Sequence, residues 1–394
     1  METETRDLLF CCVHSLARRT LVGTVHCDVQ DPFFLVAHYE ADGSERRRTI
    51  SSPRHHQKHS QMPSGGARPF SYLCFLDQRM RVQEAQNAPL IGFLLGVSII
   101  GCCNGLLCFQ PNNASIFIWN PATREVRKAL VAVDISLRES FKMGFGFSSI
   151  ANDYKIVRMR VSLNNERFIR MQECNLFANL VDQVQVYSLS TGSWSAIEFG
   201  NLDGIYLVSN GFPANGAIFW LGFMLNSGEN DEIVGHLIVS FDVATEVFTL
   251  IPLPASVPRS YRNKLTVHEN NLALLSHTFI GNYESSLIDL WVMNEGTGAS
   301  GGRWNWTKKY STSPYPCILI PGTIWRNEIV CHSVAWHINA AEREGRNGEQ
   351  NIFLVNLSTN EVKTFAISRN SMSHDIFNYV ESLAPVGNNH IEEI

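Results

Sequence analysis

Residues 101–126 read GCCNGLLCFQPNNASIFIWNPATREV and contain two turn signals, each between apolar segments. The first is Asn104-Gly105, a pair that tolerates the positive φ angles of a type I′ turn and is a strong hairpin signal. The second opens at Asn120, whose side chain can accept a hydrogen bond from the backbone two residues on, and Thr123 can do so more weakly. The stretch therefore predicts two successive β-hairpins.

Two other interpretations of this region are weaker. Residues 89–109 are apolar almost throughout, and they are long enough to cross a bilayer core about 30 Å thick. Four glycines, several strand-favouring residues and the Asn-Gly turn oppose a membrane-spanning helix. The adjacent Cys102 and Cys103 would point to opposite faces of a strand, with no histidine nearby, so a metal site is also disfavoured.

The strand-turn-strand pattern of the second hairpin recurs four times along the chain. Each copy has alternating apolar residues, and in most copies a polar residue and a Thr then form a tight turn. Another hairpin precedes each copy, so each unit has four strands, and the spacing of about 50–70 residues is near the period of kelch-type propeller blades. The opening strands of the copies end at Trp119, Tyr187, Phe241, Trp291 and Val355.

The sequence therefore predicts an all-β fold, a β-propeller of about six four-stranded blades. Residues 70–77 and 376–386 are strand-like and lie outside the complete units, so we expect the termini to share one blade and close the ring. The apolar spacing of residues 7–22 predicts a short α-helical N-terminal remnant. Residues 41–69 are polar, basic and rich in Ser, Pro and Gly, which predicts a disordered linker.

Whole-chain properties limit the location and the partners. The formal net charge of −5 gives no overall attraction to nucleic acid or to an anionic membrane, so we expect neither as a partner. The N-terminus lacks the basic and apolar regions of a secretion signal, which predicts a cytoplasmic and/or nuclear protein with reduced cysteines. The basic run within residues 46–58 can also be a nuclear localisation or nucleic-acid patch, although no aromatic residues are interleaved with it.

The sequence contains no motif typical of catalysis, so we expect neither an enzyme nor a bound cofactor or metal. The run of His55, His56 and His59 lacks carboxylate support, and the glycine-rich residues 296–302 lack the Lys-Ser/Thr of a phosphate-binding loop. A kelch-fold enzyme such as a copper oxidase is a distant alternative, because it requires a secreted and metal-competent site.

Insertions gather in one class of connection, between the second and third strands of a unit. They span residues 162–182, 224–235 and 337–350. Varying loop length on one face of a rigid scaffold is typical of a binding face, and the mixed charge favours a protein partner. The alternative is that these are ordinary solvated loop residues. The candidate contact residues are Arg167, Phe168, Arg170, Phe177, Glu229, Asp231, Glu232, Arg343 and Arg346.

Several longer motifs follow one another over about residues 70–386: GCCNGLLCF with IFIWNPATREV, MGFGFSSIANDYKIVRM, VQVYSLSTGSW, NGAIFWLG, IVSFDVATEVFTLIPLP, IDLWVM and YVESLAPV. In these motifs and their order the chain resembles plant F-box proteins that carry a C-terminal F-box-associated domain. The resemblance implies a non-catalytic substrate receptor of a cullin-RING ubiquitin ligase. In that family the F-box helices bind a Skp-type adaptor, and the associated domain captures the target protein.

The resemblance also implies a domain order. Residues 1–40 correspond to a truncated or degenerate F-box remnant, 41–69 to the linker, 70–386 to the F-box-associated β-propeller and 387–394 to a C-terminal tail. The Leu-Pro signature that opens a family F-box is missing, so a propeller scaffold that no longer binds an adaptor is the alternative function. The remnant of the adaptor-binding face would be Leu8, Leu9, Val13 and Leu16, which can equally pack on the neighbouring domain.

Overall fold

The structure is a computed structural model of the 394-residue chain. It describes residues 33–40, 70–76, 82–84, 97–111, 115–129, 139–170, 175–202, 204–225, 233–258, 262–280, 285–294, 304–315, 318–333, 350–368 and 376–387. Within these ranges the chain is built of β-strands, with one 3-10 turn at Gly200–Leu202 and no α-helix. The all-β prediction is confirmed, and the helix predicted over residues 7–22 lies outside the described residues.

Four of the five sheets have four strands each. One runs in the order β25 (Ile376–Tyr379), β1 (Phe33–Glu40), β2 (Phe70–Leu76) and β3 (Val82–Glu84). The next contains β4 (Val97–Cys103), β5 (Leu106–Pro111), β6 (Ile116–Trp119) and β7 (Val126–Ala129). The others contain β17 (Lys264–His268), β18 (Asn271–Ile280), β19 (Ser285–Asn294) and β20 (Asn305–Ser311), and then β21 (Leu319–Trp325), β22 (Glu328–Ser333), β23 (Gln350–Asn356) and β24 (Val362–Ser368).

The fifth sheet has nine strands and combines two of the predicted units. One unit supplies β8 (Glu139–Ser148), β9 (Asp153–Arg170), β10 (Asn175–Ser188) and β11 (Ser193–Ile197), and the other supplies β13 (Phe212–Ala214), β14 (Ala217–Leu225), β15 (Ile233–Asp242) and β16 (Phe248–Pro252). Between them, β12 (Ile205–Leu207) pairs with both β10 and β14. The count of five sheets therefore differs from the expected number of about six blades, because this short strand joins two units into one sheet.

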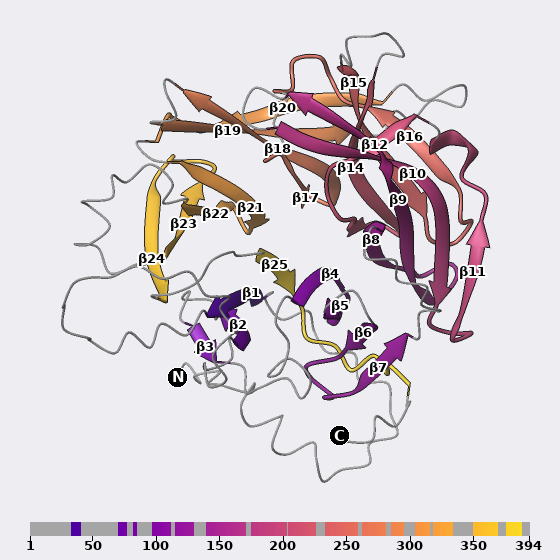
Figure 1. Ribbon diagram of the computed structural model, residues 1–394. Coiled ribbons are helices and arrows are strands. Elements are labelled where there is room, and N and C mark those ends of the chain that lie inside the picture. Colours follow the sequence, from indigo (N-terminus) through magenta and orange to yellow (C-terminus); the bar gives the residue numbers. More distant parts are fainter. Residues whose placement is uncertain are drawn as a thin grey trace, which may run out of the picture.

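The sheets surround a common centre, and their innermost strands form a closed ring (Figure 1). Around the ring, β4 contacts β8, and contacts continue from β8 through β13, β17, β21 and β25 back to β4. The closure joins the two ends of the chain, as predicted, because β25 pairs with β1 and β1 pairs with β2. β1 lies within residues 1–40, which were expected to form an F-box remnant outside the ring, so the sheet begins earlier in the chain than residue 70. Pairing of the N-terminal and C-terminal strands completes this sheet, so strand contacts run around the ring without a gap in the described part.

The Asn-Gly turn of the opening sequence stretch has the predicted conformation. Asn104 and Gly105 connect β4 to β5 and have φ angles of 47° and 75°, which a type I′ turn requires. The same device recurs between β13 and β14, where Asn215 and Gly216 have φ angles of 48° and 78°. Among the residues that the structure describes, no helix has the length and apolar character needed to cross a membrane.

The turns between the third and fourth strands of the units are held by the predicted side-chain hydrogen bonds. The Oδ1 atom of Asn120 accepts hydrogen bonds from the backbone N–H groups of Ala122 and Thr123 at 2.9 and 3.3 Å. The Oδ1 atoms of Asp242 and Asn356 accept equivalent bonds two and three residues on. These bonds satisfy backbone donors within each turn, so one short sequence pattern gives the same turn on three sheets.

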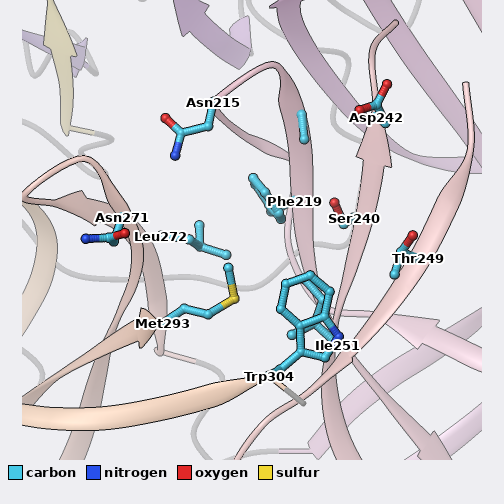
Figure 2. Close-up of a pocket in the computed structure, with 11 residues that line it drawn as sticks. Asn215, Phe219, Ser240, Asp242, Thr249, Ile251, Asn271, Leu272, Met293 and Trp304 are labelled. Carbon is cyan, nitrogen blue, oxygen red and sulfur yellow. The ribbon is translucent and has the colours of Figure 1, made fainter. Parts of the chain in front are cut away.

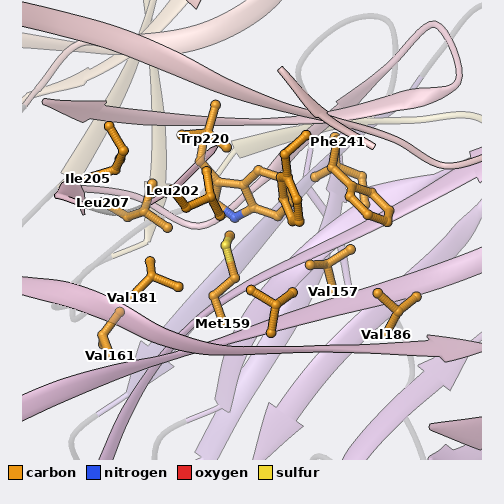
Figure 3. Packing of buried hydrophobic residues seen from close by; sticks show 14 of the residues in the cluster. Val157, Met159, Val161, Val181, Val186, Leu202, Ile205, Leu207, Trp220 and Phe241 are labelled. Atoms are coloured by element: carbon orange, nitrogen blue, oxygen red, sulfur yellow. The ribbon is translucent and has the colours of Figure 1, made fainter. Parts of the chain in front are cut away.

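Among the described residues, the largest buried cluster lies between the two units of the nine-stranded sheet (Figure 3). Trp220 of β14 is completely buried there, and its Nε1–H donates a hydrogen bond to the Met143 carbonyl of β8 at 3.1 Å. The indole packs against Gly144 and Gly211, where an added Cβ would lie within 2.5 and 2.8 Å of the Trp220 ring. Glycine at these two positions lets the backbone approach the ring closely.

Candidate protein-recognition site on the turn face

The two ends of the ring differ in how the strands are connected. One end, called here the turn face, carries the tight turns that follow the first and third strands of a unit, such as Asn104-Gly105, Asn215-Gly216 and residues 242–247. The opposite end, called the connection face, carries the links between the second and third strands. Of the large apolar side chains that are exposed in the described ranges, five lie on the turn face: Ile150, Val247, Trp304, Val380 and Leu383. Met224 and Ile280 lie toward the connection face.

The turn face contains a cavity between the nine-stranded sheet and the β17–β20 sheet (Figure 2). Its volume is about 230 Å³. The nine-stranded sheet contributes Asn215, Ala217, Phe219, Ser240, Asp242, Thr249 and Ile251, and the neighbouring sheet contributes Asn271, Leu272, Met293 and Trp304. The cavity therefore lies on a seam between two sheets that follow one another along the chain, since β16 ends at Pro252 and β17 begins at Lys264.

The floor of the cavity is apolar and already packed. Phe219, Ile251, Leu272 and Met293 have exposed fractions of 7%, 1%, 2% and 5%. All four belong to the hydrophobic cluster that holds the two sheets together. Strand alternation explains their position, because every second residue of β14, β16, β18 and β19 points into this seam. The cavity is consequently formed by the scaffold itself.

The rim of the cavity is polar and is held by the turns. The Asn215 Nδ2–H donates a hydrogen bond to the Asn270 carbonyl at 2.8 Å, which ties a turn of the nine-stranded sheet to a turn of its neighbour. The Oδ1 atom of Asp242 accepts three hydrogen bonds, from the N–H groups of Ala244 and Thr245 and from the Thr245 hydroxyl, at 2.7–2.9 Å. Asp242 itself is exposed, so the carboxylate is fixed in position and reaches solvent.

An aromatic side chain completes the site at the end away from the polar turns. Figure 2 shows Trp304 and Met293 at one end of the cavity, with Asn215 and Asp242 at the other. Trp304 precedes β20 and has an exposed fraction of 36%. Two positions later, the Trp306 Nε1–H donates a hydrogen bond to the Pro252 carbonyl of β16 at 3.2 Å, which anchors the start of β20 across the seam. The exposed Trp304 indole is therefore positioned by a strand whose start is fixed to the neighbouring sheet.

The described part of the chain contains potential metal ligands and cysteine thiols. No three His, Cys, Asp or Glu side chains among these residues gather as a metal site. Cys102, Cys103, Cys108 and Cys331 are free thiols. Burial raises the pKa of Cys103 to about 12 and that of Cys102 further above its usual range, so both thiols are protonated near neutral pH.

The structure describes only part of the predicted contact surface. Residues 162–182, expected as a loop, are mostly strand: β9 and β10 extend as a long hairpin in which Phe168 pairs with Phe177 and Arg167 with Ala178. Arg170, in the same hairpin, pairs with Asn175. The expectation of a loop was therefore wrong there, because the extra residues continue the antiparallel ladder. Glu229, Asp231, Glu232, Arg343, Arg346, Leu8, Leu9, Val13 and Leu16 lie outside the described residues.

The sequence reasoning missed the cavity on the turn face. In the sequence, Asp242 fits the polar turn position of the repeated hairpins and Trp304 follows the glycine-rich residues 296–302, but neither pattern indicates a shared site. Loop length does not reveal this site, because the turns around it are short. Trp304 beside the long, glycine-rich residues 295–303 was the available signal.

Comparison with known proteins gives consistent matches. The family model for the F-box associated beta propeller domain matches residues 34–390. F-box protein CPR1 of Arabidopsis thaliana is 26% identical over 54% of this chain and 51% of its own length. An F-box/kelch-repeat protein of the same plant is 26% identical over 57% of this chain and 54% of its own. The chain thus spans about half the length of these curated relatives.

One solved structure with a similar arrangement is the β-propeller domain of the Trilobed protease from Pyrococcus furiosus. It has a TM-score of 0.36 and 11% sequence identity, and the match covers 69% of this chain and 83% of that domain.

Proposed function

Because the chain belongs to the F-box associated β-propeller domain family, we propose that it is the substrate-recognition subunit of a cullin-RING ubiquitin ligase. The relatives named as F-box proteins support this role. In this proposal the chain has no catalytic site of its own, and the ring presents a target protein for ubiquitination. Such a receptor acts in the cytoplasm, the nucleus or both.

The proposal rests on the character of the turn face. Exposed apolar side chains and a preformed cavity occur together on one end of a rigid ring. Exposed apolar groups with polar rims are typical of protein-interaction sites. The bonds from Asn215 to the Asn270 carbonyl and within the Asp242 turn hold the rim in place, which lowers the ordering cost of binding.

The second half of the role is assembly with the ligase. A Skp-type adaptor would bind the segment before β1, and a cullin would bind through the adaptor. Leu8, Leu9, Val13 and Leu16 are the residues of that segment that we propose for adaptor contact. Target binding and ligase assembly therefore involve separate regions of the chain.

Co-expression with a Skp-type adaptor and a cullin tests the assembly. We expect the tagged chain to recover both proteins, and a variant with Asp at positions 8, 9, 13 and 16 to recover neither. A matched variant with Asp at the exposed turn-face residues Ile150 and Val247 should still recover both. If the unaltered chain recovers no adaptor where an intact F-box protein does, the ligase role is wrong, and the alternative of an interaction scaffold replaces it.

A further inference from the structure

We propose that the turn-face cavity binds a lysine or arginine side chain from an exposed segment of the target protein. This inference rests on the substrate-receptor function proposed above, and it names the chemical feature of the target that the receptor recognises. The argument uses the size of the cavity, the character of its floor and the charge on its rim.

The size of the cavity suits a single side chain. Pockets for drug-sized molecules usually have volumes of roughly 300–1,000 Å³. The cavity here has about 230 Å³ and opens to solvent between the two sheets. A cofactor-sized molecule would exceed this volume, whereas one long side chain on an extended peptide would fit into it.

The floor suits the apolar stem of a long side chain. Phe219, Ile251, Leu272 and Met293 present an apolar surface, with Trp304 at the end away from Asp242 (Figure 2). Lysine and arginine bury their aliphatic stems along apolar surfaces while their charged heads stay at polar groups. A short polar side chain would leave this floor uncovered, and a purely apolar one would leave the polar rim without a partner.

The described part of the rim supplies one charge, and that charge is negative. Asp242 is the sole ionisable residue among the eleven described residues that line the cavity, so no described lysine or arginine of the lining neutralises it. The neighbouring turn adds Glu269, whose side chain is 76% exposed. The nearby Lys155 is already paired with Glu246 at 2.8 Å. A cationic head group therefore gains a carboxylate partner here, whereas a phosphorylated or acidic segment would be repelled.

The chain itself offers a matched variant for the test. Asn120 and Asn356 occupy the same turn position as Asp242 on other sheets and accept the same backbone hydrogen bonds. Asp242→Asn should therefore keep the turn and remove only the charge. Glu361→Gln makes the same change in net charge at an exposed turn-face residue of the β21–β24 sheet and serves as the control.

The experiment uses the purified full chain and a synthetic peptide library. Each nine-residue peptide has one of the twenty amino acids fixed at its centre and mixed residues elsewhere, and binding is followed by fluorescence anisotropy. We expect Lys- and Arg-centred peptides to bind at least about tenfold more tightly than Glu- or Leu-centred ones, as for a charge-assisted hydrogen bond. This preference should weaken about tenfold in Asp242→Asn and stay unchanged in Glu361→Gln.

A third variant separates the stem from the head group. Trp304→Ala should weaken binding of Lys- and Arg-centred peptides about three- to tenfold, because the aliphatic stem loses apolar contact area on the indole. The inference is overturned if Asp242→Asn keeps the full preference for Lys- and Arg-centred peptides. It is also overturned if the unaltered chain binds no peptide of the library, or binds them without preferring a basic central residue. Recovery of the Skp-type adaptor tests the receptor role separately. A failure of the proposed ligase role can therefore be distinguished from a failure of the proposed lysine or arginine recognition.

Discussion

The turn face and the connection face of the ring are built from the opposite ends of the same strands, yet they are held differently. On the turn face, side chains such as Asn120, Asp242 and Asn356 fix the backbone of each turn. Cross-links such as Asn215 to the Asn270 carbonyl then join neighbouring sheets. Toward the connection face, β9 and β10 extend their ladder as far as the Arg170 and Asn175 pair.

The difference teaches that long connections and a preformed site need not occur on the same face. Varying connection length favours the connection face as the place for target binding. The cavity and most of the exposed large apolar side chains in the described ranges favour the turn face. A receptor can use one face to hold a target and the other to vary its contacts, and the changes below test how independent the two faces are.

The largest effect should come from the core that supports both faces. Trp220→Ala removes a completely buried indole and the hydrogen bond to the Met143 carbonyl, so we expect a loss of about 3–5 kcal/mol in the free energy of unfolding. Trp194→Ala, in the outer strand β11, should cost only about 1–2 kcal/mol because this indole is half-buried. Urea unfolding monitored by circular dichroism measures both. Equal losses would mean that the packing of Trp220 between the two units contributes no more to stability than the packing of Trp194.

A histidine buried toward the connection face should make stability depend on pH. Burial, together with the Arg262 guanidinium, lowers the pKa of His277 from 6.5 to about 4. As the pH falls, His277 is therefore protonated in the unfolded chain before it is protonated in the folded chain. The contribution of neutral, buried His277 to stability is complete above pH 6.5 and is lost as the pH falls toward 4. The loss approaches about 3 kcal/mol, at about 1.4 kcal/mol per pKa unit.

The measurement compares chemical unfolding of the unaltered chain and of His277→Leu at several pH values between 7 and 4. The variant should lose less stability across this range, because it carries no group to protonate. Parallel pH profiles for the two proteins would show that His277 is not responsible.

Two equivalent turns on the turn face should differ in importance. Asn120 is completely buried, and its Nδ2–H group donates to the Ser382 and Ala384 carbonyls at 2.9 Å, which clamps the C-terminal segment onto the ring. Asn356 makes the same turn but is half-buried. We expect Asn120→Ala to cost about 2–4 kcal/mol and Asn356→Ala about 1 kcal/mol.

Hydrogen exchange gives a second readout for the clamp. Asn120→Ala should raise exchange of the amides near Ser382, whereas Asn356→Ala should leave them protected. If both variants behave alike, the hydrogen bonds from Asn120 to the C-terminal segment add no stability beyond the bonds within the turn.

Local chemistry accounts for what the sequence could predict. The Asn104-Gly105 turn, the Asn120 and Asp242 turns and the alternation along each strand depend on neighbouring residues, so pattern alone locates them. The joined sheet depends on Tyr206, which pairs with Leu180 on one side and Phe223 on the other, and such long-range pairing leaves no local signal. The cavity escaped prediction for the same reason, because Asp242 and Trp304 come to line one cavity only after two sheets pack together.

The smallest effect concerns the ion pair that links the two units of the nine-stranded sheet on the turn face. Lys155 and Glu246 are 2.8 Å apart, and their side chains are 9% and 34% exposed. The Lys363 and Glu328 pair has a similar distance of 2.9 Å but lies within one sheet, with exposures of 57% and 12%. Double-mutant cycles with Met for Lys and Gln for Glu should give a coupling near 1 kcal/mol for the first pair and a clearly smaller coupling for the second.

The reason for this difference is solvent screening, because water and salt weaken the more exposed pair. Raising the salt concentration should therefore reduce the coupling of Lys363 with Glu328 more, in relative terms, than that of Lys155 with Glu246. Equal couplings with equal salt dependence would mean that burial does not distinguish the two pairs. If the coupling of Lys155 with Glu246 were near zero, the two units would be held together on the turn face by the backbone turns and apolar packing, and this charge pair could vary without changing the shape of the cavity.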